Sequence, residues 1–165
     1  MKTILFATLL LAAFFTATQA QDKTIVLVRH AERDNSVPNN PDPALTKEGV
    51  ERAERLWKAV KKYKPHEIFS TDFKRTKQTV EHVALKRKKQ VQTYDPTKSA
   101  DLIAKMMASR TEHYLVVGHS NTIPVLANQL AKKEVFRQLL ETEYGVIWVV
   151  RIRKGVLKNV EIFTY

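Results

Sequence analysis

The 165-residue sequence predicts a three-layer α/β/α sandwich in which a mostly parallel sheet ends in a C-terminal antiparallel hairpin. Two features of the sequence indicate this fold class. Short runs of apolar, often β-branched residues alternate with longer segments of helical periodicity, which is the pattern of βα units. The last two apolar runs, 146–152 and 156–163, instead flank Lys154-Gly155 with no helix between them, as in a β-hairpin.

The first βα unit lies between residues 24 and 65. Residues 24–28 form a continuous apolar run without alternation, which predicts a strand buried on both faces. Residues 31–44 are rich in Asp, Asn and Pro and predict a loop. Thr46 is expected to cap a helix that Pro65 closes. The apolar residues of this helix recur at helical spacing: Val50, Ala53, Leu56, Trp57 and Val60.

The same alternation continues through the rest of the chain. We expect strands over 67–69, 91–94 and 114–117, and helices over 72 to about 86 and over 98–109. A further helix follows the strand at 114–117 and is marked by Ile123, Leu126, Ala127 and Leu130. Strands buried on both faces need helices above and below the sheet, and three layers follow.

The composition fits one globular domain and excludes cysteine chemistry. Hydrophobic residues make up 44% of the chain, which is enough for a packed core. There is no cysteine, so disulfides, thiolate metal sites and a cysteine nucleophile are all excluded. The chain carries 28 Lys and Arg against 17 Asp and Glu, a formal charge of +11. This charge raises the question of a nucleic-acid or other anionic partner.

The first twenty residues are typical of a secretory signal peptide. Lys2 provides a basic start, residues 4–15 are almost entirely apolar, and Thr18-Gln19-Ala20 places small residues at the positions that a signal peptidase reads before cleavage after Ala20. The apolar run is shorter than the roughly 20 residues that span a bilayer, and it lacks the polar face of an amphipathic helix. We therefore expect export to the periplasm or the cell exterior. The mature domain would comprise residues 21–165, without membrane attachment and as a monomer.

Histidines and arginines follow three of the predicted strands. Arg29 and His30 come after the first strand, Arg75 lies in the segment after the second, and His119 and Ser120 follow the later buried strand. Ligands of open α/β sheets bind outside the carboxyl ends of the strands. We therefore expect these residues to meet at one edge of the sheet, in an arrangement suited to a phosphate group.

Four motifs in order along the chain resemble those of the histidine phosphatase superfamily, the phosphoglycerate mutase-like proteins. Residues 27–32, Leu-Val-Arg-His-Ala-Glu, resemble its Arg-His-Gly-Glu signature, with Ala31 in place of the usual glycine. The further matches are Leu-Thr-Lys-Glu-Gly at 45–49, Ser-Thr-Asp-Phe-Lys-Arg-Thr-Lys-Gln-Thr at 70–79 and Val-Val-Gly-His-Ser-Asn-Thr at 116–122. The long insertion and extra acidic motif of mutases and bisphosphatases are missing. The resemblance implies a small phosphohistidine phosphatase-like enzyme acting on a small phosphorylated substrate, with mutase-type phosphoryl transfer as the alternative.

The residues in these motifs suit phosphoryl transfer, which requires a positioned nucleophile and cations around the phosphoryl oxygens. His30 would attack phosphorus through one ring nitrogen while a backbone carbonyl holds the other. Arg29 and Arg75 would bind the phosphate and disfavour the imidazolium form of the nucleophile. His119 could donate to a third oxygen, and the backbone N–H of Ser120 could add to this at a helix start.

The general acid has two candidates, Glu32 and Asp95, because each follows a predicted strand at the expected edge. Each also has a structural interpretation. Glu32 could form a salt bridge within the loop, and Asp95 could start a turn before Pro96. The residues leave both possibilities open.

Three other functions compete with phosphoryl transfer. Gly118-His119-Ser120 resembles part of a serine hydrolase elbow, but no Asp or His follows Ser120 to complete a triad. The basic run at 86–89 lacks interleaved aromatic residues, so we expect a solvated surface and no nucleic acid, with a non-catalytic polyanion-binding protein as the alternative. The histidines have no paired metal-ligand spacing, and we expect neither metal nor cofactor; they are His30, His66, His82, His113 and His119.

Overall fold

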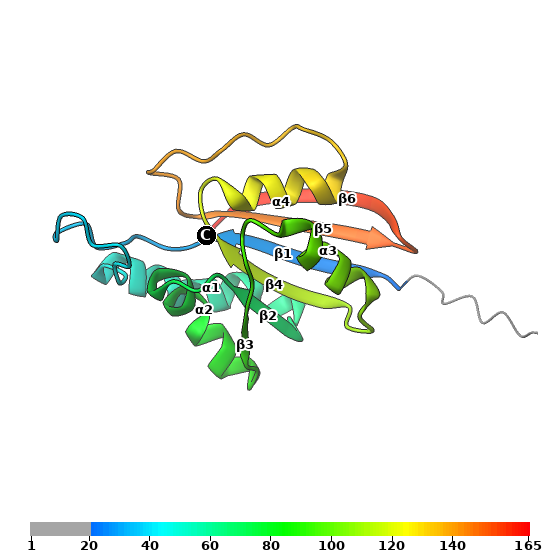
Figure 1. The fold of residues 1–165 in the computed structure, drawn as a ribbon. Coiled ribbons are helices and arrows are strands. Elements are labelled where there is room, and N and C mark those ends of the chain that lie inside the picture. Colours follow the sequence, from blue (N-terminus) through cyan, green and yellow to red (C-terminus); the bar gives the residue numbers. More distant parts are fainter. Residues whose placement is uncertain (1–20) are drawn as a thin grey trace, which may run out of the picture.

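The computed structural model describes residues 21–165, and the predicted signal peptide lies outside the described residues. A single six-stranded sheet has the order β3-β2-β4-β1-β5-β6 (Figure 1). The strands are β1 (Lys23–Arg29), β2 (Glu67–Ser70), β3 (Val91–Thr93), β4 (His113–Gly118), β5 (Val146–Arg153) and β6 (Val156–Thr164). The first four run parallel, whereas β5 is antiparallel to both β1 and β6. The predicted mixed sheet with a C-terminal hairpin is confirmed.

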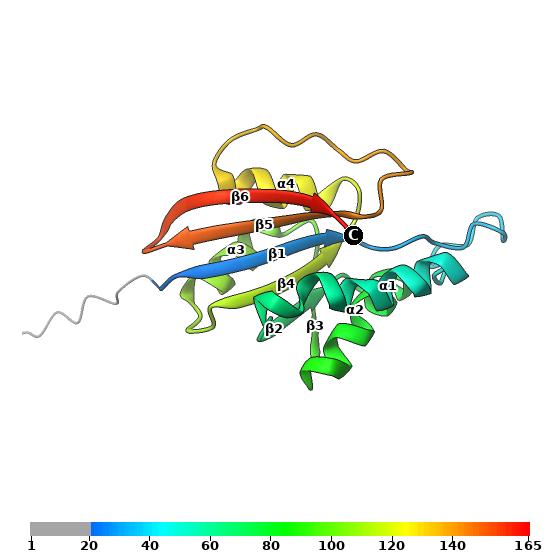
Figure 2. The ribbon, with the colours of Figure 1, turned by 180° about the vertical axis from the view of Figure 1, so that it is seen from behind.

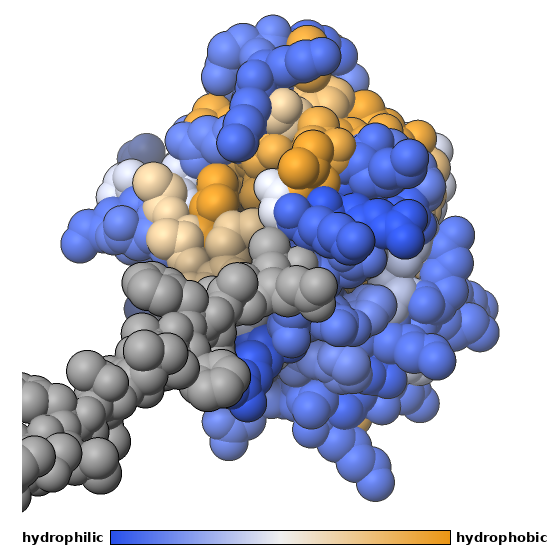
Figure 3. All heavy atoms as spheres, turned by 90° about the vertical axis from the view of Figure 1, so that its right-hand side faces the viewer, coloured by the Kyte–Doolittle hydropathy of each residue, from blue (hydrophilic) through white to orange (hydrophobic). Residues whose placement is uncertain are grey.

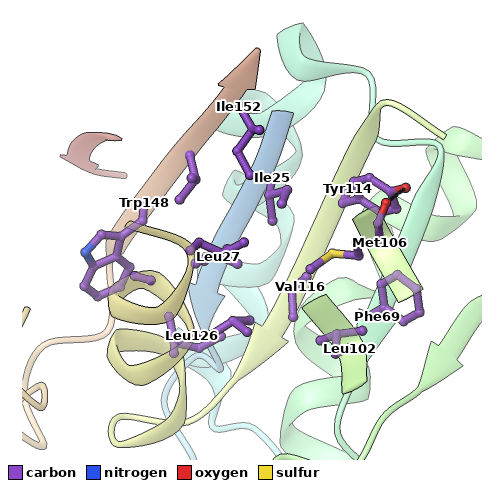
Figure 4. Close-up of a cluster of buried hydrophobic side chains, with 14 of the residues drawn as sticks. Ile25, Leu27, Phe69, Leu102, Met106, Tyr114, Val116, Leu126, Trp148 and Ile152 are labelled. Carbon is purple, nitrogen blue, oxygen red and sulfur yellow. Dashed lines mark hydrogen bonds between the residues drawn. The ribbon is translucent and has the colours of Figure 1, made fainter. Parts of the chain in front are cut away.

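Two helices cover each face of the sheet, which confirms the three layers. Helices α1 (Lys47–Val60) and α2 (Lys74–Arg87) lie on one face, and α3 (Ser99–Ala108) and α4 (Thr122–Ala131) lie on the other (Figures 1 and 2). Strand β1 is buried on both faces because Val26 and Val28 pack toward α1 and α2 while Ile25 and Leu27 pack toward α3 and α4. Figure 4 shows the second of these cores, where Leu102, Met106 and Leu126 meet the sheet.

The helix boundaries differ from the predicted ones where backbone geometry intervenes. Helix α2 begins at Lys74 because Phe73 is still extended, with φ −125° and ψ 146°. The N–H of Lys74 is satisfied by Asp42 Oδ1 at 2.8 Å, from a distant loop. Helix α1 ends in a 3₁₀ turn over Lys61–Tyr63 before Pro65, whereas its start at Thr46 is capped as predicted, because the Thr46 hydroxyl accepts from Gly49 N–H.

A long connection between α4 and β5, residues 132–145, extends over the carboxyl end of the sheet (Figure 1). We call this segment the arch. The side-chain amide of Asn128 anchors its first part, accepting from the N–H groups of Val135 and Phe136. Leu139 is buried, and its N–H donates to Ser120 O at 3.0 Å. The arch is therefore fixed to the segment that follows β4.

The surface at one end of the described domain is largely hydrophilic (Figure 3). Figure 3, which views the molecule from one end, shows mostly hydrophilic side chains with a smaller hydrophobic area. Within residues 21–165 no helix combines the length and the apolar character needed to cross a bilayer.

Candidate active site

A pocket of about 290 Å³ contains the residues that were predicted to bind phosphate. We call it the histidine pocket. Its lining is contributed by the segments that follow β1 and β4, by the start of α2 and by the arch. The lining residues are Arg29, His30, Arg33, Arg75, His119, Ser120, Asn121, Gln138 and Glu141. The structure thus brings together Arg29, His30, Arg75, His119 and Ser120, from three segments that are far apart in the sequence.

The ring of His30 is held in one tautomer by the backbone of the next residue, Ala31. His30 directly follows β1, its side chain is buried, and its Nδ1 lies 2.7 Å from Ala31 O. Because a carbonyl oxygen can only accept a hydrogen bond, Nδ1 carries the proton. The N–H of Ala31 in turn donates to Thr79 Oγ1 at 3.0 Å, which fixes this turn of the backbone against α2. His30 Nε2 therefore has a free lone pair.

His30 is neutral at ordinary pH. Burial lowers the pKa of His30 to about 3, although the hydrogen bond to Ala31 O opposes the shift. The neighbouring His119, Arg29 and Arg75 lower the pKa further. Arg29 and Arg75 were expected to keep His30 neutral, whereas burial is the larger cause. A neutral imidazole with a free lone pair is a competent nucleophile.

His119 lies beside His30, with ring centroids 5.5 Å apart. Its Nε2 is 3.0 Å from Thr71 Oγ1, and this hydroxyl donates its own proton to Thr76 Oγ1. His119 Nε2 is therefore the donor toward Thr71, and Nδ1 is the ring nitrogen available to a ligand. Burial, followed by the charges of Arg75, Arg29 and Arg33, lowers the pKa of His119 to about 4.

Arg75 places a buried cation in the histidine pocket. Its side chain, from the first turn of α2, packs over the ring of Phe73 with 4.3 Å between the guanidinium carbon and the ring centroid. Among residues 21–165 its Nε and one terminal nitrogen are buried without a hydrogen-bond partner, and a carboxylate oxygen of Asp42 is 3.9 Å away. Burial and the charge of Arg33 lower the pKa of Arg75. Unpaired buried guanidinium donors are suited to an anionic ligand.

Arg29 holds the arch, a role that was not predicted. One terminal nitrogen donates to the carbonyl oxygens of Leu140, Glu141 and Glu143 at 2.7, 3.3 and 3.3 Å. The other donates to Glu141 Oε2 at 3.1 Å, and the guanidinium stacks on the ring of Tyr144. Among the described residues its Nε is buried without a hydrogen-bond partner, and it is one of the donors left for a ligand.

Four lining residues were missed in the sequence analysis: Arg33, Asn121, Gln138 and Glu141. Arg33 lies three positions after His30, and its backbone forms an isolated bridge with Leu45. The residues around it indicated only a loop, but a basic residue so close to His30 was a usable signal. Gln138 and Glu141 belong to the arch, which has no periodicity from which its position could be predicted.

The structure does not bring the two acid candidates into the histidine pocket. Glu32 accepts three hydrogen bonds from Arg52 of α1, at 2.8, 2.9 and 2.6 Å, and does not line the histidine pocket. Asp95 is exposed and accepts from the N–H and hydroxyl of Thr97, in the turn before α3. Glu32 therefore forms the salt bridge, and Asp95 the turn start, that were given above as their structural interpretations. The carboxylate that lines the pocket belongs to Glu141.

Comparisons with known proteins agree with the fold. The sequence model described as the histidine phosphatase superfamily (branch 1) matches residues 25–98. A solved structure of the protein histidine phosphatase SixA complexed with tungstate has a TM-score of 0.66 and 19% identity, covering 86% of this chain and 96% of that one. A protein of Agrobacterium tumefaciens assigned as the phosphohistidine phosphatase SixA has a TM-score of 0.66 and 18% identity, covering 87% and 99%.

A third solved structure widens the range of similar proteins. Phosphoserine phosphatase from Entamoeba histolytica, in complex with 3-phosphoglyceric acid, has a TM-score of 0.66 and 15% identity, covering 84% of this chain and 96% of that one. A comparison with curated protein sequences gave no match. At these identities the solved structures establish the fold alone.

The architecture is that of a phosphoglycerate mutase-like α/β protein. The predicted resemblance to the histidine phosphatase superfamily is confirmed, because the family's sequence model matches residues 25–98 and solved phosphatase structures share the fold.

Binding of an oxyanion to the histidine pocket should be accompanied by proton uptake. Because the pKa of His119 is about 4 in the free protein, the ring is neutral at pH 7. A bound dianion would favour the imidazolium form and raise this pKa. Sulfate, whose charge is constant from pH 7 to 5, should therefore bind more tightly as pH falls. Calorimetry in two buffers of different ionisation enthalpy measures the uptake, and His119→Asn should remove it. Equal heats in both buffers for the unaltered protein would contradict the prediction.

Proposed function

We propose that residues 21–165 form an exported phosphatase that hydrolyses phosphomonoesters or phosphoramidates through a phosphohistidine intermediate at His30. The observation that carries the proposal is the hydrogen bond between His30 Nδ1 and Ala31 O at 2.7 Å, which leaves Nε2 unprotonated beside Arg75 and His119. The N-terminal sequence, with Lys2, an apolar run at 4–15 and Ala20, supports export.

The reaction has two steps. In the first, His30 Nε2 forms a bond to phosphorus while the bond from phosphorus to the leaving group breaks, and the leaving group departs with the electron pair. In the second, water attacks the phosphohistidine, the nitrogen–phosphorus bond breaks, and inorganic phosphate leaves with the water oxygen. Arg75 and Nε of Arg29 would bind the phosphoryl oxygens in both steps, with the N–H of Ser120 as a further donor and His119 Nδ1 as another once the bound anion has led to protonation of the ring.

The pocket favours leaving groups that need no proton from a carboxylic acid. Glu32 and Asp95 lie outside it, and Glu141 is paired with Arg29 at 3.1 Å and lies 3.8 Å from Arg33. An ion-paired carboxylate accepts hydrogen bonds and has no proton to donate. Imidazole, the leaving group of a phosphohistidine, departs readily at neutral pH, whereas an alkoxide needs protonation as it leaves. Phosphoramidates and aryl phosphates are therefore the preferred substrates in this proposal.

A substrate panel tests the proposal directly. Purified residues 21–165 should release inorganic phosphate from phosphohistidine and p-nitrophenyl phosphate, and much more slowly from glycerol phosphate. Comparable rates for glycerol phosphate would show that an acid assists the leaving group. Failure to release phosphate from any of the three would contradict the proposed function.

The activity should be independent of a divalent metal ion. The histidines of the sequence lack metal-ligand spacing, and the proposed reaction uses arginines as its cations. We expect the rate to be unchanged by a chelator and to be inhibited by vanadate, which resembles the transferred phosphoryl group. Loss of activity in the chelator, with recovery on adding a divalent ion, would contradict this prediction.

A further inference from the structure

A second hollow lies between helix α2 and strand β3, away from the histidine pocket. Its volume is about 860 Å³, and we call it the lysine groove. Its apolar lining comes from Ala84, Leu85 and Val91, and Leu85 is 70% exposed. Four lysines and one carboxylate, Glu81, also line it; the lysines are Lys74, Lys77, Lys88 and Lys89. The groove therefore combines an apolar floor with a rim of net positive charge.

One wall of the lysine groove is an open sheet edge. Strand β3 is the last strand of the sheet at this end and pairs with β2 (Figure 1). The N–H of Tyr94 donates to Ser70 O of the neighbouring segment at 3.0 Å. Because successive residues of a strand alternate, the main-chain N–H and C=O groups of Val91 and Thr93 point away from β2. The side chains of the same two residues line the groove. An added strand would find both its hydrogen-bonding groups and its side-chain contacts here.

The charge of the lysine groove selects the kind of partner. Lys77 pairs with Asp72, but Lys74, Lys88 and Lys89 form no ion pair among the described residues. A second copy of this chain, with a formal charge of +11, would be repelled from the same edge. No aromatic side chain lines the groove, so it offers no stacking surface for nucleic-acid bases.

We propose that the lysine groove binds an extended acidic segment of a partner protein, which pairs with β3 as an additional strand. Main-chain hydrogen bonds to Val91 and Thr93 would hold the segment, and an apolar side chain would rest on Leu85. Acidic side chains on either side would meet the lysine rim. The groove reaches Lys74, the neighbour of Arg75, so the partner would lie beside the histidine pocket.

A labelled synthetic peptide in which valine alternates with aspartate and glutamate tests this binding by fluorescence anisotropy. The full domain should bind the peptide, and a version with lysine in place of the acidic residues should not bind. A third version carries N-methyl groups on alternate backbone amides, which leaves its charge intact but prevents strand pairing. We expect this version to bind at least about tenfold more weakly than the parent peptide.

Two protein variants with matched controls locate the site. Lys88→Gln/Lys89→Gln should weaken binding about tenfold at low salt. The control is Lys132→Gln/Lys133→Gln. Lys88 and Lys132 each directly follow a helix and have left-handed backbone with φ 53°, and all four lysines are exposed. Thr93→Pro should also abolish binding, since it removes an N–H that points away from β2. None of these residues lines the histidine pocket, and turnover of small substrates should be unchanged.

Three results would overturn the proposal. Equal binding of the N-methylated peptide would exclude strand pairing. Equal weakening by the two double lysine variants would show a diffuse basic surface. Binding of a sulfated polysaccharide at the groove in preference to the peptide would make the partner a polyanion. The assay requires no catalysis, so its outcome is independent of whether the proposed phosphatase activity is found.

Discussion

His30→Ala should abolish turnover and the covalent intermediate together. Brief incubation of the unaltered domain with a phosphoryl-labelled substrate should leave an acid-labile, base-stable group on the protein. In His30, the hydrogen bond from Nδ1 to Ala31 O orients the ring and leaves the lone pair of Nε2 free to attack. The alanine variant has no nitrogen at this position. Losing a nucleophile that acts as part of a unit lowers kcat by about 10⁴-fold or more. Quenched labelling followed by gel analysis, with the rate of phosphate release, measures both effects.

A matched variant controls for the loss of a histidine. His66 is exposed, lies immediately before β2 at the opposite end of the sheet and does not line the histidine pocket. His66→Ala should retain the label and the rate. If the label survives unchanged in His30→Ala, the nucleophile is a residue other than His30. Thermal unfolding of both variants separates loss of chemistry from loss of fold, because His30 is buried and its removal leaves a cavity.

Arg75→Ala should lower kcat/KM by about 10² to 10⁴-fold, because two charge-assisted hydrogen bonds of about 1.5 to 3 kcal/mol each are removed. The two buried donors of Arg75 have no partner in the part of the chain that the structure describes and are expected to contact the phosphoryl oxygens in both ground and transition states. The loss should persist at high salt, since the contact is short and shielded from solvent. Steady-state kinetics at low and high salt measure it.

The comparison with surface lysines distinguishes a pocket contact from general attraction. Lys88→Gln/Lys89→Gln removes two exposed charges outside the histidine pocket, and its effect on a small substrate should be slight. Any effect should act through long-range steering and fade as ionic strength rises above about 0.15 M, where the Debye length is about 8 Å. A loss at high salt as large as that of Arg75→Ala would make the basic run part of a binding site for an extended polyanion.

The sequence was sufficient for the fold and for the centre of the site because both depend on local patterns. The run at 24–28 and the alternation after it predict a layered sheet, and the carboxyl ends of its strands then bring His30, Arg75 and His119 together. The ends of elements were harder to predict. Helix α2 starts two residues later than expected because Phe73 is still extended, and an aspartate from another loop, Asp42, accepts a hydrogen bond from the first N–H of the helix.

The parts of the site that could not be predicted depend on contacts between distant residues. Glu32 is paired with Arg52, twenty positions away in the sequence, and does not line the pocket. Arg29 donates to carbonyl oxygens of the arch. Because every residue has a main-chain carbonyl group, the sequence does not indicate which of them will accept a hydrogen bond. Burial of the His30 ring, the main cause of its lowered pKa, likewise arises only when the layers and the arch are assembled.

The contacts between Arg29 and the arch make this segment a favourable starting point for protein engineering. Three of the four hydrogen bonds that tie it to Arg29 end on main-chain oxygens, of residues 140, 141 and 143. Every amino acid supplies such an oxygen, so these bonds do not depend on which side chains the arch carries. A combinatorial library at Gln138 and Glu141 could thus vary the wall of the cavity while its support is retained. Selection from that library for new leaving groups would change specificity without touching His30, Arg75 or His119.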